Sequence, residues 1–235
     1  MTAAPVLRLA NVRRAYNGLR PLRINDLSIA PGERVAVSGL DAGAAEVLVN
    51  LVTGASVPDE GEVFVLGQST ASISDGEAWL ESLDRFGIVS PRAVLLDAAT
   101  LLQNLAMPIT LDIDPVPPDV AAQVTRLARD VGIEEPWLER PLAALDPAIQ
   151  ARAHLARAIA LNPSLLILEP PTAGLAKGEG KAFGEVVAGV AAARSLATLM
   201  ISEDVDFSTA AATRRLALQG ATGELKPPKR RFFGF

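Results

Sequence analysis

The chain has 235 residues, of which 49% are hydrophobic and 21% are charged, and its formal net charge is -5. This is the composition of a globular protein that can bury a sizeable core, and its acidic balance gives no reason to expect nucleic acid as a partner. The absence of cysteine excludes disulfides and cysteine metal sites, and the single histidine, His154, leaves no histidine set for zinc, so no metal site is predicted.

The first third of the chain is rich in predicted strands. Residues 7–16 and 22–30 alternate apolar and polar side chains, as half-buried strands do. Residues 33–39 are a short apolar run ending at glycine, which favours a buried central strand. A helix is predicted over residues 44–52 from the spacing of its apolar residues, and a further strand over residues 61–68.

The middle of the chain changes to a helical pattern. Helices are predicted within residues 98–111 and 119–133, on either side of the proline-rich stretch PVPPD. Between them they would form a helical subdomain of about residues 93–149. One face of the second helix would carry the apolar residues Val120, Val124, Leu127 and Val131.

The α/β pattern returns in the last third. It consists of a helix from about residue 147 to 161, a buried strand at 165–169, a helix near 179–193, and strands at 197–202 and 214–220. We therefore expect a single domain of residues 1–225. Its α/β core would comprise residues 1–92 and 150–225, with the helical subdomain inserted between them.

The last ten residues, KPPKRRFFGF (226–235), form a basic aromatic tail. Two interpretations stay open: a frayed terminus, or a short anchor to a partner or to an anionic membrane surface. No run reaches the roughly 18 uncharged apolar residues of a spanning helix, and the amino terminus lacks a signal-peptide pattern. The sequence thus predicts a cytoplasmic protein, with any membrane contact made through a partner.

Two separated segments carry a resemblance to a known family. A strand, a glycine turn and a helix occupy residues 35–52, and QARAHLARAIALNPSLLILEPPTAGL occupies residues 150–175. With GEVFVLG and LLQNLAMP between them, they resemble the ATP-binding cassette (ABC) ATPases, closest in style to lipoprotein-release and cell-division-type cassettes. The resemblance implies a P-loop NTPase-like ABC nucleotide-binding domain with an antiparallel β subdomain and a helical insert. It also implies ATP and Mg²⁺ as cofactors and a membrane permease as partner.

The phosphate-binding loop departs from the family pattern G-x-x-x-x-G-K-[ST]. Counting from Gly39, Ala44 stands at the second glycine, Ala45 at the lysine, and Glu46 at the hydroxyl that binds magnesium. The lysine normally reaches the β- and γ-phosphates, and alanine has no charge to replace it. The first lysine in the chain is Lys177, so no shift of register restores the motif.

Acidic residues stand where the triphosphate would lie. A carboxylate about 4 Å from a phosphate charge costs roughly 4 kcal/mol at an effective dielectric constant near 20. Two interpretations remain: Asp41, alone or with Glu46, caps the helix in place of phosphate, or ATP binding is retained. Tyr16 aligns with the aromatic residue that stacks on adenine, although any half-exposed strand tyrosine would look the same. The vestigial nucleotide site comprises Tyr16, Gly39, Asp41, Gly43, Ala44, Ala45, Glu46, Val47 and Glu169.

The remaining family motifs have changed as well. Glu169 keeps the charge of the magnesium-linked aspartate, but Pro170 replaces the catalytic glutamate and has no acid–base group. His154 lies inside the signature helix and is not a displaced catalyst. The degenerate positions are Pro91 (glutamine loop), Asp146, Pro147 and Ala148 (signature), Pro170 (catalytic glutamate), Ala176 (D-loop aspartate) and Glu203 (switch histidine).

Loss at every catalytic position beside an intact apolar framework predicts a pseudo-ATPase with no catalytic residue. ATP and Mg²⁺ binding would be weak or lost, and a homodimer or a heterodimer with another cassette would have compromised composite sites. The predicted role is a structural or regulatory subunit that binds a membrane permease through LLQNLAMPITL, at the cytoplasmic face of the inner membrane. The alternatives are a conventional ATP-hydrolysing transporter subunit with diverged motifs, and a soluble regulator unrelated to transport.

Overall fold

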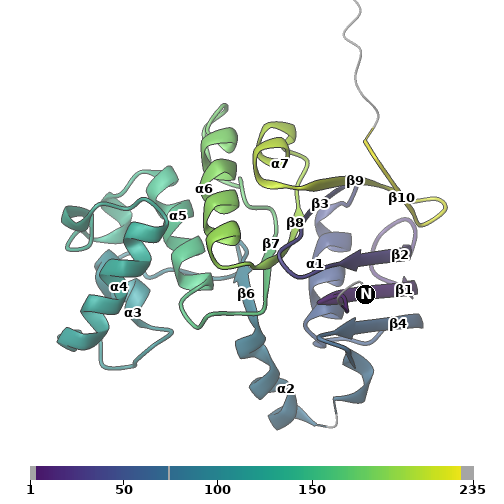
Figure 1. Ribbon diagram of the computed structural model, residues 1–235, viewed down its shortest axis with the longest axis horizontal. Helices are drawn as coiled ribbons and strands as arrows, with labels where there is room; N and C mark the ends of the chain where they lie inside the picture. Colours follow the sequence, from purple (N-terminus) through teal and green to yellow (C-terminus); the bar gives the residue numbers. More distant parts are fainter. Residues whose placement is uncertain (1–3, 74, 229–235) are drawn as a thin grey trace, which may run out of the picture.

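Two β-sheets form the framework of the computed structural model, which describes residues 4–73 and 75–228 (Figure 1). The central 6-stranded sheet has the order β10-β9-β3-β8-β7-β6, and the 4-stranded antiparallel sheet has the order β2-β1-β4-β5. The strands are β1 (Leu7–Arg14), β2 (Leu22–Ile29), β3 (Arg34–Ser38), β4 (Glu60–Val65), β5 (Gln68–Ser69), β6 (Phe86–Val89), β7 (Leu165–Leu168), β8 (Ala197–Ile201), β9 (Arg214–Gln219) and β10 (Glu224–Lys226).

Helices cover the central sheet on both faces. In Figure 1, α3, α4 and α5 lie at the left, and α1 lies next to the antiparallel sheet at the right. The α-helices are α1 (Ala42–Val52), α2 (Gly76–Ser82), α3 (Leu101–Ala106), α4 (Pro118–Asp130), α5 (Pro147–Ala158), α6 (Gly180–Ala193) and α7 (Val205–Ala211). Short 3-10 turns are η1 (Thr70–Ser72), η2 (Leu83–Arg85), η3 (Glu135–Trp137) and η4 (Leu142–Ala144).

Parallel pairing places the functional loops at one edge of the central sheet. Strand β3 pairs in parallel with β8 and β9, β8 with β7, and β7 with β6. The carboxyl ends of these strands therefore lie together, and so do the loops that follow them. In open α/β sheets this edge is where ligands bind.

Two apolar cores lie on opposite faces of the central sheet. Strand β7 is buried along its whole length, and its alternate side chains enter different cores, as a strand's two-residue period requires. Leu165 and Ile167 pack in the core shared with α1 and the antiparallel sheet. Leu166 and Leu168 pack in the core shared with α3 to α7.

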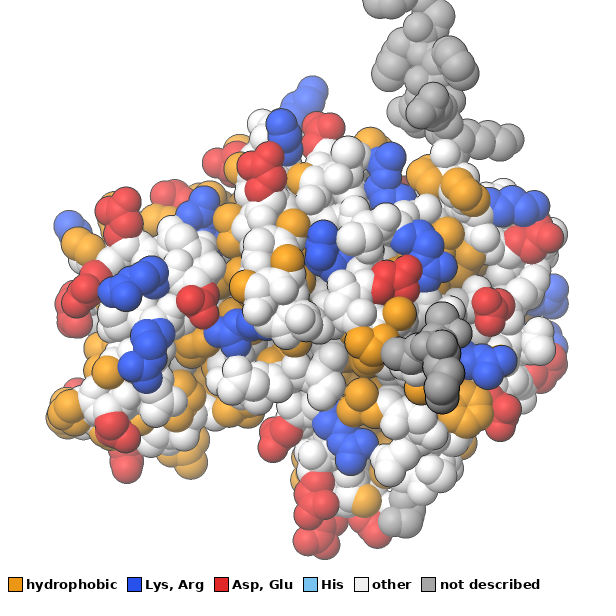
Figure 2. Space-filling model, in the orientation of Figure 1, with side chains coloured by type: hydrophobic (Ala, Val, Ile, Leu, Met, Phe, Trp, Pro, Cys, Tyr) orange, Lys and Arg blue, Asp and Glu red, His pale blue; other side chains and the backbone are white. Residues whose placement is uncertain are grey.

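The helical insert leaves the central sheet after β6 and returns at α5. Its helix α4 buries Val120, Val124 and Leu127 on one face, and Val131 at its end is also buried, which confirms the predicted apolar face. On the face shown in Figure 2, hydrophobic side chains gather over the lower end of the insert, whereas charges of both signs are spread elsewhere. Within the described residues, no helix is long and apolar enough to cross a membrane.

Three boundaries predicted from the sequence were wrong. The strand expected at 61–68 is a hairpin, because Leu66 and Gly67 have positive φ angles of 51° and 80° and turn the chain from β4 into β5. The helix expected to reach residue 161 ends at Ala158, and the chain then turns through Asn162, whose φ is +52°, before it enters β7.

The boundary of the tail was the third error. Lys226, expected to begin the basic tail, belongs to β10, where it pairs with Ala217 and forms a 2.6 Å ion pair with Glu224. Residues 229–235 of the tail lie outside the described part of the chain.

Candidate functional site

The loop between β3 and α1 begins at Gly39, a position where the local structure allows only glycine. Gly39 has a φ of +87°, which L-residues with a side chain rarely adopt. A Cβ at this position would lie 2.7 Å from the carbonyl oxygen of Leu218 in β9. Both the backbone conformation and the neighbouring strand therefore demand glycine here.

Asp41 caps the helix that follows the loop. Its Oδ1 accepts a hydrogen bond from the Ala44 backbone N–H at 2.8 Å, and its carbonyl oxygen accepts the Ala45 N–H at 2.9 Å. The free N–H groups of a helix start are an anion site, and here the anion is a carboxylate of the same chain. This confirms the predicted self-capping by Asp41.

The same role predicted for Glu46 was wrong. Glu46 lies beyond the first turn of α1, where backbone N–H groups already bond to carbonyl oxygens within the helix. Its carboxylate instead pairs with Arg92, at 2.9 Å between Oε1 and Nη1. Glu46 thus contributes an ion pair to the site and no cap.

A second carboxylate reaches the loop from β8. The Gly39 N–H donates to Glu203 Oε1 at 2.5 Å, and Glu203 lies just past the end of β8, which pairs in parallel with β3. Two internal carboxylates, those of Asp41 and Glu203, therefore accept N–H groups at the two ends of this short loop. Glu203, which the resemblance matched to the family's switch histidine, is thus part of the hydrogen bonding of this loop.

The side chain of Tyr16 packs against the start of α1. Its hydroxyl donates to Asp41 Oδ2 at 3.0 Å, and its ring lies so close to Gly43 that a Cβ there would be 3.1 Å from it. Burial raises the pKa of the Tyr16 hydroxyl, and the hydrogen bond to Asp41 and its negative charge raise it further. Tyr16, for which adenine stacking was one interpretation, is thus held by Asp41, the residue that caps α1.

Arg92 is the important residue that sequence reasoning missed. Its Nη2 donates to Glu169 Oε2 at 2.6 Å while its Nη1 pairs with Glu46. The Glu169 side chain is only 6% exposed, and burial raises the pKa of this carboxyl, with Arg92 opposing and Glu46 adding to the shift. The guanidinium is therefore the counter-charge for a buried acid at the end of β7.

The four carboxylates of Asp41, Glu46, Glu169 and Glu203, with Arg92, line a cleft of 510 Å³ at the carboxyl edge of the central sheet, whereas Tyr16, Gly39, Gly43 and Ala44 are not among its described lining residues. Among the described residues that line it, Arg92 is the one cation, against five carboxylates. The polar and charged lining residues are Asp41, Glu46, Ser90, Arg92, Glu169, Thr172, Ser202, Glu203 and Asp204. The apolar lining residues are Leu40, Ala42, Ala45, Pro91, Pro170, Ala173 and Ile201.

Several predicted site residues lie elsewhere. The signature positions begin helix α5: Asp146 Oδ1 accepts the Ile149 N–H at 2.9 Å, Pro147 is the first helical residue, and Ala148 follows it. Ala176 lies in a separate turn, where its N–H donates to Glu179 at 2.9 Å. Val47, half-buried in the second turn of α1, is not among the described residues that line the cleft.

A separate groove of 330 Å³ lies between β6 and the helices α3 and α5. Its lining includes Met107 and Pro108 from the segment predicted to contact a permease, together with His154 of α5. Burial lowers the pKa of His154, and the nearby Arg157 lowers it further. The other lining residues are Leu83, Asp84, Phe86, Ile88, Ala93, Arg157, Ala158 and Leu161.

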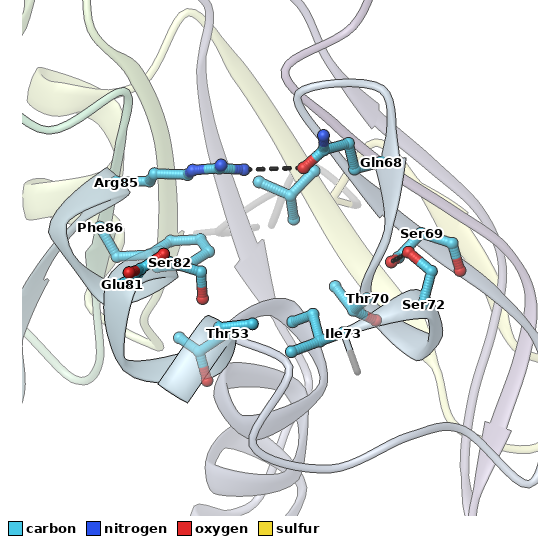
Figure 3. Close-up of a pocket in the computed structure, with 12 residues that line it drawn as sticks. Thr53, Gln68, Ser69, Thr70, Ser72, Ile73, Glu81, Ser82, Arg85 and Phe86 are labelled. Atoms are coloured by element: carbon cyan, nitrogen blue, oxygen red, sulfur yellow. Dashed lines mark hydrogen bonds between the residues drawn. The ribbon is translucent and has the colours of Figure 1, made fainter. Parts of the chain in front are cut away.

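A third cavity, of 370 Å³, lies beneath the β4–β5 hairpin beside α2 (Figure 3). Arg85 and Gln68 reach toward each other across it, with a 3.0 Å hydrogen bond from Arg85 Nη1 to Gln68 Oε1. Within the described residues, none of the predicted site residues lines this cavity.

The fold and the loop–helix site define the class of protein. A family model described as ABC transporter matches residues 22–173, so the chain belongs to the ABC transporter family as a cassette of the nucleotide-binding type. The chain is 26% identical to the lipoprotein-releasing system ATP-binding protein LolD of Psychrobacter arcticus over 93% of its length and 98% of the relative. It is 30% identical to LolD of Alcanivorax borkumensis, over 74% of this chain and 77% of that protein.

Other relatives and solved structures agree. The methionine import ATP-binding protein MetN of Brucella abortus is 27% identical over 92% of this chain and 58% of its own length. The bacterial ABC transporter cassette MJ0796 has a TM-score of 0.74 at 22% identity, over 97% of this chain and 100% of that chain. The cbiO1 cassette of Clostridium perfringens has a TM-score of 0.78 at 19% identity, over 95% of this chain and 88% of that chain. At such identities the structural likeness concerns the fold, which is the predicted ABC cassette fold.

Proposed function

We propose that this chain is a non-hydrolysing ABC cassette subunit that serves as a structural or regulatory partner of a membrane permease. The observation that carries the proposal is the occupation of the loop by internal anions. Asp41 accepts the Ala44 N–H and Glu203 accepts the Gly39 N–H, so donors that would serve a phosphate already have carboxylate partners.

The charge of the cleft argues against a bound triphosphate. Each carboxylate about 4 Å from a phosphate charge costs roughly 4 kcal/mol, which is about a thousandfold in affinity. Arg92 is the cation nearest to replacing the missing lysine, but Glu46 and Glu169 hold it on both sides. The residues present therefore do not fit magnesium triphosphate, and we derive no catalytic step through it.

The cleft also lacks a residue at position 170 that could act as a general base for ATP hydrolysis. Pro170 follows Glu169 on the wall of the cleft and has no group that could accept a proton from water. Glu169 itself is buried and paired with Arg92, so it has little freedom to orient a water molecule. These two residues together support the proposal that the chain does not hydrolyse ATP.

The groove beside the insert supports the choice of partner. Its apolar lining includes Phe86, Ile88, Met107 and Leu161, and Asp84, His154 and Arg157 supply polar groups. An amphipathic helix from a permease would bury its apolar face there. We propose that the chain reaches the cytoplasmic face of the inner membrane by this contact, in the manner of a transport subunit.

Titration with a fluorescent ATP analogue and Mg²⁺ tests the nucleotide half of the proposal. We expect no saturable binding at millimolar nucleotide and no phosphate release, with an ATP-hydrolysing cassette measured in parallel as positive control. Micromolar binding, with turnover that Glu169→Gln abolishes, would establish the conventional transporter subunit instead.

Co-purification with a genomically adjacent permease tests the partner half. We expect capture by the wild-type chain and loss of capture by Met107→Asp, which places a charge in the apolar groove. Leu80→Asp is the matched control, since Leu80 is exposed on α2 and is not among the described lining residues of the groove. A folded chain that captures no permease and never fractionates with membranes would favour a soluble regulator.

A further inference from the structure

One guanidinium joins three separate parts of the fold. Arg92 follows β6, at the start of the connection into the helical insert. Its Nη1 lies 2.9 Å from Glu46 Oε1 on α1, and its Nη2 lies 2.6 Å from Glu169 Oε2 at the end of β7. The insert is thereby tied to two elements of the α/β core at the point where it departs.

The two acidic partners of Arg92 belong to the α/β core, Glu46 in α1 and Glu169 directly after β7, and the Glu169 side chain is also buried. The Glu169 backbone N–H donates to the carbonyl of Val89 at 2.8 Å, which holds the carboxylate against the end of β6. Its side chain is 6% exposed, and a buried carboxylate without a counter-charge is costly. Glu46 projects from the regular part of α1, whose apolar residues are packed in the core. The position of the guanidinium is therefore set from two sides.

The residue directly after Arg92 lines the groove beside the insert. Ala93 contributes to the groove, and its N–H donates to the Ser90 carbonyl at 3.0 Å. The carbonyl of Val94 accepts a 2.6 Å hydrogen bond from Arg157, another groove residue. Only one peptide bond thus separates the ion-pair network of the cleft from the wall of the groove.

The connection beyond Arg92 is held from the insert side as well. Asn104, fully buried in α3, accepts the Leu96 N–H at 2.7 Å and donates to the Leu96 carbonyl at 3.0 Å. Arg157 and Asn104 hold the outer part of this connection, whereas Arg92 holds its origin. Without Arg92, the described hydrogen bonds of residues 90–94 would be those within the segment, donated by the N–H groups of Arg92, Ala93 and Val94, and the bond from Arg157 to the Val94 carbonyl.

We infer that Arg92 is a positioning residue, a strap between Glu46 and Glu169 that keeps the wall of the groove formed without any ligand in the cleft. The proposed function states that the chain binds a permease, and the strap explains how its docking surface stays ordered when no nucleotide is bound. The strap itself is a property of the isolated chain. Only its effect on permease binding rests on the proposed function.

Amide hydrogen exchange of the isolated chain tests the strap. The reporters are the N–H groups of Arg92, Ala93 and Val94, each of which has an acceptor within this connection. In the double variant Arg92→Met/Glu169→Gln, we expect them to exchange about tenfold faster, which corresponds to about 1.4 kcal/mol of local opening. Replacing both partners leaves no buried charge unpaired, so the thermal midpoint should return close to wild type while the fast exchange persists.

Matched variants complete the experiment. Arg92→Lys keeps a cation that can pair with one carboxylate, so it should restore part of the protection. Arg85→Met is the control, because Arg85 precedes β6 and bonds to Gln68, far from the cleft's network. It should leave exchange at Arg92–Val94 unchanged.

Unchanged exchange in the double variant would overturn the strap, whatever the chain binds. Faster exchange throughout the whole protein, rather than in this connection, would also overturn it, since that is general destabilisation. Intact protection in the wild type with no permease captured would instead defeat the proposed function and leave the strap standing. Loss of permease affinity in the double variant, at an unchanged thermal midpoint, is the expected joint result.

Discussion

The carboxylate of Glu203 accepts the backbone N–H of Gly39 at 2.5 Å, across a sequence separation of 164 residues. Together with Asp41 it makes the phosphate loop of this cassette a site whose anions belong to the chain. Under the proposed function, introducing a lysine into this loop should therefore not be enough to give nucleotide binding.

The variant Ala45→Lys tests this directly, because Ala45 lines the cleft at the family's lysine position. We expect it to bind no ATP measurably, since the carboxylates of Asp41 and Glu203 remain. The triple variant Asp41→Asn/Ala45→Lys/Glu203→Gln should bind at least about a thousandfold more tightly than Ala45→Lys alone. Asparagine still caps a helix and glutamine still accepts a hydrogen bond, so the loop should keep its shape. Equal affinities in calorimetric titrations would contradict the electrostatic explanation.

The single tyrosine of the chain makes the contact between Tyr16 and Asp41 measurable by phenolate absorbance. Burial and Asp41 raise the pKa of Tyr16, so Asp41→Asn should lower it toward its ordinary value of 10.0 without reaching it. A raised folded pKa contributes stability that is present below pH 10.0 and lost as the pH rises through the folded value. Asp146→Asn, at a helix cap that does not contact Tyr16, is the control and should leave the titration unchanged.

Removing Arg92 should destabilise the protein in a pH-dependent way. Arg92→Met leaves Glu169 buried without its counter-charge, and we expect a loss of about 3 kcal/mol in the free energy of unfolding at neutral pH. Because burial raises the pKa of Glu169 above 4.5, its contribution to stability is present below pH 4.5 and lost as the pH rises through the folded value. Urea unfolding over a pH series should show a steeper loss in Arg92→Met than in wild type.

The double variant with Glu169→Gln is the control for that loss. It removes the buried charge together with its partner, so stability at neutral pH should return to within about 1 kcal/mol of wild type. A double variant as unstable as Arg92→Met would assign the loss to the packing of the arginine side chain instead.

His154, the single histidine, reports on the groove. Burial and Arg157 lower the pKa of its imidazole below 6.5, so its contribution to stability is present above pH 6.5 and lost as the pH falls through the folded value. The imidazole NMR signals of the chain should give this pKa without overlap. Arg157→Met should raise it, and the surface variant Arg126→Met should not. An imidazole pKa at or above 6.5 would mean that the groove is more open to water than its geometry indicates.

The parts of the site that sequence reasoning predicted depend on neighbours along the chain. Asp41 caps an N–H three residues ahead, and the strand–turn–helix frame around it is contiguous, so both could be inferred from local rules. The alternation of Leu165 to Leu168 between two cores likewise needed only an apolar run of strand length. Local preferences and tertiary structure agree at these positions.

What was missed depends on register between distant strands. Glu203 was recognised only as a lost histidine, because its contact with Gly39 arises from the parallel pairing of β3 with β8. Arg92 and Glu169 are 77 residues apart, and nothing near Arg92 in sequence indicates a buried carboxylate. Strand β6 was missed because four residues, one of them glycine, are too short a run to show an alternating pattern, although Phe86, Ile88 and Val89 favour a strand.

Gly39, the glycine at the start of the loop, is required by the fold itself. Gly39 is needed because its φ is positive and a side chain there would collide with the Leu218 carbonyl of a neighbouring strand. The requirement for glycine comes from the backbone conformation and the neighbouring strand, so it does not depend on a nucleotide binding to the loop. The presence of glycine at the head of such a loop therefore attests to the architecture of a cassette, whereas turnover of nucleotide depends on the residues around it.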